Sequence, residues 1–171
     1  MVLIAFIMAC LHPTKPDSSL PSAPVSTVIT LASPESAEVV KTPTSVRDTI
    51  NGALQSRGLT IAQNSSTETV QAQGTAAGRV AALLRATGGQ LGVLIDTTAR
   101  PRAELSGRYP WQVDVTITVA QDGREPLTDS SRIPVSLTHI HQGETDALKA
   151  ASTRIARRAA ILVDRFRRDT P

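Results

Sequence analysis

Hydrophobic and polar residues alternate most clearly over residues 111–119, where every second residue is apolar. A period of two is typical of a strand with one buried face, so this stretch predicts a β-strand lying on a core. Asp122 and Gly123 follow as a hairpin signal, and the alternation returns over residues 133–137. Because Pro134 cannot donate a backbone hydrogen bond, we expect this second strand to lie at a sheet edge or to be bulged.

The period changes to that of a helix near the C-terminus. Residues 145–168 carry an apolar residue every three or four positions, at Leu148, Ala151, Ile155, Ala159, Leu162 and Phe166. This stripe predicts the longest helix of the chain, packed on the sheet through its apolar face. Arginines lie largely off the stripe, and some crowd the last turn, where cations complement the helix dipole.

Shorter patterns predict the elements that come first. Residues 25–31 are rich in β-branched residues and predict the first strand, and residues 59–62 predict a second, short one. Between them, Ser45 and Asp48 stand at capping-box spacing and predict the start of a helix, which Gly58 ends.

A second helix is expected over residues 76–86, with Gly88 ending it. Ser65 and Glu68 form another capping-box pair before it. The strand that begins at Leu91 is expected to run towards residue 105, with an irregularity at the proline on the way.

The predicted order is therefore β-α-β-α-β-β-β-α. We expect an α+β fold over residues 25–168, in which helices pack on a single mixed or mostly antiparallel sheet of about five strands. Aromatic residues make up only 2% of the chain, so the core must be built from Val, Ile, Leu and Ala.

The chain begins with an apolar stretch that fits an export signal. Residues 1–9 are uncharged, and at about 1.5 Å each they are too short to cross a hydrocarbon core of roughly 30 Å. They match the apolar section of a signal peptide, which ends in a small residue. Residues 10–24 contain four prolines and predict an extended tether of about 40 Å. The alternative is a buried apolar N-terminal segment with an inert thiol.

The tetrad Ile7-Met8-Ala9-Cys10 resembles the lipobox of bacterial lipoproteins. The resemblance implies that Cys10 becomes the mature N-terminus, with a diacylglyceryl thioether and an N-linked acyl chain such as palmitate. Two or three acyl chains anchor a protein effectively permanently. Leu11, in place of an aspartate, implies sorting to the outer membrane.

No sequence motif of a nucleophile elbow, a phosphate-binding loop or a metalloprotease occurs in the chain. Carboxylates such as Asp96 are expected on solvated strand faces. His139 and His141 would share one face of a strand near Glu144 and Asp146, but two histidines without a clear third ligand do not predict a metal site. We therefore expect no catalytic residue, metal or cofactor, and no enzyme. A small hydrolase using these histidines is the alternative that metal analysis tests.

The net charge of +3 favours anionic surfaces without selecting one. The outward arginines of the last helix are the candidate contact surface for an anionic partner: Arg154, Arg157, Arg158 and Arg165. A solvated outer helix face is the alternative. Nucleic acid is not the expected partner, because one tryptophan and one tyrosine do not make a stacking platform. A cytosolic basic domain that binds nucleic acid nevertheless stays the alternative function.

The succession of residues 45–63, 76–99 and 111–125 with a final helix is similar to a group of bacterial envelope domains. The group includes the amino-terminal domain of the Tol-system translocation protein, curli-pore lipoproteins and lipoprotein activators of penicillin-binding proteins. The resemblance implies a non-enzymatic adaptor or assembly factor that faces the periplasm and binds an envelope protein or peptidoglycan.

Overall fold

The computed structural model describes residues 24–33, 35, 39–62, 75–103 and 107–169. The expected leader, and most of the tether with Cys10, lie outside these residues. The strands and helices are β1 (Val25–Ala32), β2 (Val39–Val40), α1 (Thr44–Gln55), α2 (Ala76–Thr87), β3 (Leu91–Pro101), β4 (Tyr109–Gln121), β5 (Leu127–Leu137) and α3 (Glu144–Arg168).

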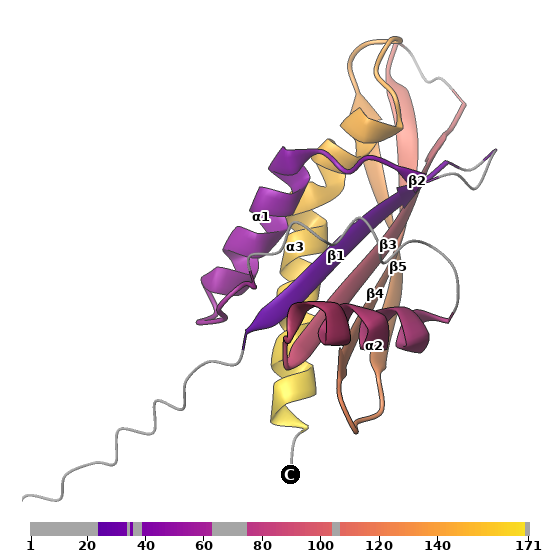
Figure 1. Cartoon of the computed structure of the whole chain (residues 1–171). Helices are drawn as coiled ribbons and strands as arrows, with labels where there is room; N and C mark the ends of the chain where they lie inside the picture. The colour runs from indigo at the N-terminus through magenta and orange to yellow at the C-terminus, as the bar shows by residue number, and fades with distance from the viewer. Residues whose placement is uncertain (1–23, 34, 36–38, 63–74, 104–106, 170–171) are drawn as a thin grey trace, which may run out of the picture.

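The strands form one mixed sheet in the order β2-β1-β3-β4-β5 (Figure 1). β1 and β3 run parallel, and the other neighbours run antiparallel. The expected α+β fold with a single mixed sheet is thus confirmed. The hairpin at Gly123, whose φ is +72°, and the edge position of the strand that carries Pro134 are confirmed as well.

The short second strand differs from the prediction. Residues 59–62 make only one parallel bridge, from Ile61 to Val25, while β2 pairs with Leu31 and Ala32. Two short segments thus share the outer edge of β1, one at its start and one at its end.

The start of β1 is bonded on both sides. The Val25 N–H donates to the Thr60 carbonyl at 2.7 Å, and the Val25 carbonyl accepts from the Ala62 N–H at 2.8 Å. On the other side β1 pairs with β3 from Val25↔Leu91 to Ala32↔Thr98. The first strand of the fold is therefore an inner strand.

Among the described helices, α1 and α3 cover one face of the sheet and α2 lies on the other (Figure 1). The main core lies under α1 and α3. Val113, Val115, Ile117 and Val119 of β4 are buried there as predicted, whereas Trp111 is only partly buried. The predicted stripe of α3 is also buried: Leu148, Ala151, Ile155, Ala159, Leu162 and Phe166. No helix among the described residues is long and apolar enough to span a membrane.

A smaller apolar cluster holds α2 on the opposite face, made of Val28, Val80, Leu83, Leu84, Leu94 and Ala120. At Gly92 of β3 an added Cβ would come within 2.6 Å of Val80 Cγ1. Only a glycine therefore lets α2 approach the strand this closely.

The helix ends match the sequence in part. Gly88 ends α2 with a φ of +63°, as predicted, and the Thr75 side chain caps its start by accepting from the Gly78 N–H at 3.2 Å. The predicted cap at Ser45 is wrong. The cap is Pro43, two residues earlier, and its carbonyl already accepts from the Val46 N–H at 3.0 Å. The pair Ser65 and Glu68 lies outside the described residues.

Candidate functional site

A cavity of about 380 Å³ lies between edge strand β5 and the outer face of α3. Of its seven lining residues, four are arginines and none is acidic. We call this site the arginine groove and define it by Arg132 and Pro134 of β5 together with Arg154, Arg157, Arg158 and Ile161 of α3.

The periods of the two elements bring these arginines together. On α3, Arg154, Arg157 and Arg158 recur at helical spacing on the face opposite the buried stripe. On β5, Arg132 and Pro134 alternate with the buried Ile133 and therefore face away from the core. One exposed helix face and one edge strand thus supply the whole groove.

The guanidinium groups of the groove differ in how they are engaged. Arg154 Nη1 donates to the Pro134 carbonyl at 2.6 Å, and Arg158 Nη2 lies 3.1 Å from Asp129 Oδ2. Arg132 Nε is 3.7 Å from an oxygen of Asp114, and its side chain is 81% exposed.

Arg157 makes no hydrogen bond or ion pair with another residue that the structure describes. Exposed ion pairs are worth about 0–1 kcal/mol, so the pair that Arg158 makes costs little to exchange. Most of the positive charge in the groove is therefore available to a ligand.

The structure brings together three of the four arginines that the sequence singles out. Arg165 does not line the groove and instead lies 3.8 Å from Asp169, in an exposed pair in the last turn of α3. Arg132 and Ile161 were missed. Arg132 could have been found from its alternation with buried residues on an edge strand, and Ile161 from its place as an apolar residue on the polar helix face. The proposed anionic partner stays a prediction.

The histidines lie elsewhere than expected. β5 ends at Leu137, so His139 and His141 lie in the turn before α3 and not on one face of a strand. The turn is held by Gln142, whose Oε1 accepts from the N–H of His139 at 2.9 Å. No three His, Cys, Asp or Glu side chains among the described residues are grouped to hold a metal ion.

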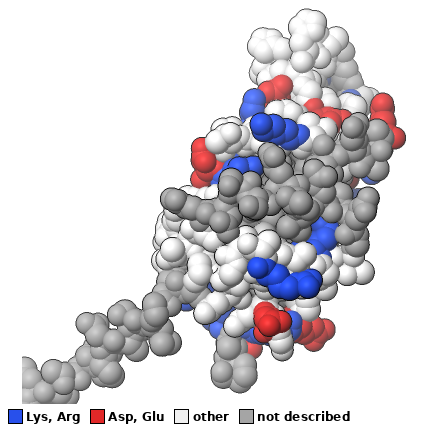
Figure 2. All heavy atoms as spheres, viewed as in Figure 1, with Lys and Arg blue, Asp and Glu red and all other residues white. Residues whose placement is uncertain are grey.

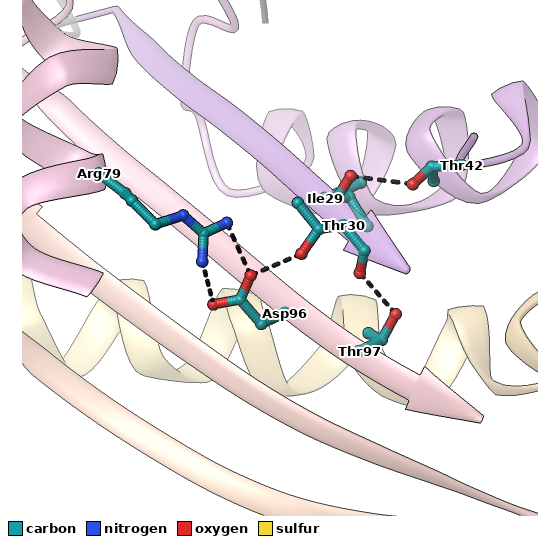
Figure 3. A network of polar contacts seen from close by, with 6 residues as sticks. All are labelled: Ile29, Thr30, Thr42, Arg79, Asp96 and Thr97. Atoms are coloured by element: carbon teal, nitrogen blue, oxygen red, sulfur yellow. Dashed lines mark hydrogen bonds and ion pairs between the residues drawn. The ribbon is translucent and has the colours of Figure 1, made fainter. Parts of the chain in front are cut away.

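A charged pair under α2 was not foreseen, because Asp96 was expected to face solvent. Arg79 of α2 forms two hydrogen bonds with Asp96 of β3, at 2.9 and 3.0 Å, and the Arg79 side chain is only 10% exposed (Figure 3). Thr30 of β1 donates to the same carboxylate at 2.5 Å. The network joins α2 to β1 and β3, and so it helps to hold the helix on the sheet.

Among the residues that the structure describes, the face that carries α2 has no comparable concentration of charge. Figure 2 shows this face, where the acidic and basic side chains of the described residues are scattered among uncharged ones. The arginine groove is therefore the strongest candidate for a binding surface.

No family model matches the sequence, and no curated protein matches it. Solved structures similar to the chain include bacterial lipoproteins. Rare lipoprotein B from Shewanella oneidensis is 10% identical with a TM-score of 0.43, over 83% of this chain and 96% of that one. A lipoprotein from Neisseria meningitidis is 15% identical with a TM-score of 0.48, over 81% of this chain and 99% of that one.

A minor lipoprotein from Acinetobacter baumannii is 11% identical with a TM-score of 0.37, over 84% of this chain and 95% of that one. At these identities and TM-scores, the likeness assigns neither a family nor a function to this chain. None of the three confirms the resemblance to the Tol-system, curli-pore and penicillin-binding-protein-activator group.

Proposed function

We propose that this chain is a bacterial envelope lipoprotein, acylated at Cys10 and held on the periplasmic side of the outer membrane. Its domain binds a protein partner or a cell-wall component and catalyses no reaction. The observation that carries the proposal is the succession of an apolar leader, the tetrad Ile7-Met8-Ala9-Cys10 and a proline-rich stretch directly before β1. An anchor, a spacer and a binding domain follow one another along the chain.

The arginine groove supports the binding part of the proposal. Binding sites that do not perform chemistry need complementary charge and shape, and they do not need groups with paired acid and base roles. Four guanidinium groups around one cavity supply the charge, and the edge strand beside a long helix supplies the shape.

The anchor is tested with the full chain in a bacterial host. We expect the intact mass of the membrane-bound protein to fit a chain that begins at Cys10 and carries added acyl mass. Cys10→Ser should lose this mass and leave the membrane fraction, because no acyl chain can then be attached through sulfur. Unchanged fractionation of Cys10→Ser would contradict the proposal.

A second variant, Leu11→Asp, tests whether the protein is sorted to the outer membrane. Leu11→Asp leaves the cysteine in place, so the acyl mass should be retained. If Leu11 directs the protein to the outer membrane, Leu11→Asp should move it to the inner membrane on a density gradient. An unchanged density would limit the proposal to membrane anchoring without a choice of membrane.

A further inference from the structure

We infer that the arginine groove binds an extended acidic segment of a protein partner, with carboxylates at alternating positions. The inference rests on the proposed binding function and names the class of partner. It uses only the described residues of β5 and α3, so it does not depend on the anchor.

Charge is the first reason. The lining contains four arginines and no acidic residue, and a guanidinium group binds a carboxylate through two parallel hydrogen bonds. Arg157 has no described partner, and Arg132 is 81% exposed. The side chains of the pair Arg158–Asp129 are 44% and 37% exposed, so a carboxylate of the ligand can replace Asp129 at little cost.

The spacing of the helix positions is the second reason. Arg154 and Arg158 are one turn apart on α3, which is about 6 Å along the helix axis. In an extended chain, side chains two residues apart point the same way and lie about 6.6 Å from one another. Glutamates at every second position would therefore meet successive arginines. Ile161 follows within the next turn, is 50% exposed and offers an apolar contact.

Pro134 hinders a simpler mode of binding, in which the partner adds a strand to the edge of the sheet along β5. Pro134 has no N–H, and its carbonyl already accepts from Arg154 Nη1 at 2.6 Å. Pro134 therefore cannot donate a hydrogen bond to an added strand, and its carbonyl already has one donor. At Pro134 the groove therefore presents arginine side chains and no backbone donor, so the charge pattern of the ligand matters.

A protein segment fits the groove better than the other polyanions of a cell. The site is concave, whereas a bilayer surface is planar, and the lining holds no aromatic residue on which a nucleic-acid base could stack. A narrow chain with carboxylates on one side satisfies both the charge and the shape.

The test is fluorescence anisotropy with the full chain in detergent micelles, at about 0.15 M salt. The probe is a labelled peptide Glu-Ser-Glu-Ser-Leu-Ser, compared with Glu-Glu-Ser-Ser-Leu-Ser and with Gln-Ser-Gln-Ser-Leu-Ser. We expect the first to bind most tightly, the second to bind less well because adjacent acids point to opposite sides, and the glutamine peptide not to bind.

The variants separate the groove from net charge. Arg157→Glu with Arg158→Glu should weaken binding about tenfold or more, because carboxylates then face carboxylates. Arg47→Glu with Arg85→Glu changes the net charge equally on exposed positions of α1 and α2 and should change binding less than about twofold. Arg157→Gln, which adds no negative charge, should give an intermediate loss. Circular dichroism checks that each variant is folded.

Three results would overturn the inference. The first is that both double variants weaken peptide binding equally. The second is that the glutamine peptide binds as tightly as the peptide with alternating glutamates. The third is that the chain binds phosphatidylglycerol vesicles or single-stranded DNA but none of the peptides. Cys10→Ser should bind the peptide as the unaltered chain does. A failed anchor with retained peptide binding therefore counts against the proposed location and not against the groove, and the reverse result counts against the groove alone.

Discussion

At Gly92 the backbone of β3 passes so close to α2 that a single methyl group would collide with Val80 Cγ1, at 2.6 Å. Val80 has a short, β-branched side chain that cannot turn away freely, and it is fully buried. Gly92→Ala should therefore lower the free energy of unfolding by about 1–3 kcal/mol. Urea denaturation followed by circular dichroism measures this change.

Gly52 is the matched control, because it lies in α1 and an added Cβ would meet nothing within 4 Å. Gly52→Ala should leave the protein equally stable or raise its stability by about 0.5–1 kcal/mol, since alanine favours the helix. Equal effects of the two substitutions would show that α2 does not lie this close to β3.

Residue-scale features could be predicted where their cause is local. Gly88 and Gly123 were predicted from their neighbours, because positive φ is required by the helix end and the hairpin turn themselves. The need for Gly92 and the pairing of Arg79 with Asp96 could not be predicted. Both depend on where α2 lies over the sheet, which no local pattern specifies.

At the scale of elements, α3 offers a comparison within one helix. Ile155 is completely buried on its inner face, whereas Ile161 is 50% exposed on its outer face. Ile155→Ala should cost about 2–5 kcal/mol, from lost burial and the cavity left behind, while Ile161→Ala should change stability by no more than about 0.5 kcal/mol. Thermal unfolding of both variants measures the difference, and similar losses would mean that the helix is rotated from the position described.

The long elements could be predicted because their periodicity is strong. The alternation in β4 and the stripe of α3 each run over many residues, so the sequence pattern identifies the buried face of each element. Residues 39–40 and 59–62 are too short for a period. Whether either pairs as a strand is decided by how much of β1 is left uncovered, which is a tertiary matter.

At the scale of the molecule, the two faces of the sheet are unequally covered. Two helices and the larger core lie on one face, and α2 lies on the other over a cluster of six buried residues, three of which are its own. Local openings cost less where less apolar surface is buried. We expect backbone amides in α2 to be protected from hydrogen exchange roughly tenfold or more weakly than those in the middle of α3.

Amides of β4 serve as the internal reference, because this strand is paired on both sides. Asp96→Asn should weaken the protection of α2 further and leave that of α3 unchanged, since the carboxylate binds Arg79. Protection of α2 equal to that of α3 would mean that α2 opens only when the whole domain unfolds.

The fold class could be predicted from the order of elements, but the arginine groove could be predicted only in part. Three of its arginines were found from the helix alone. Arg132 joins them because β5 lies at the edge of the sheet and α3 returns alongside it, and this arrangement emerges only when the strand order is known.

The way β1 enters the sheet also has a mechanical consequence. Its first residue is bonded to residues 60 and 62 on one side and begins the register with β3 on the other. Tension applied along the axis of β1 loads the hydrogen bonds of the ladder together in shear. Peeling, which breaks such bonds one at a time, is avoided. A domain pulled in this direction through its N-terminal segment would resist unfolding at β1, the strand to which the force is applied.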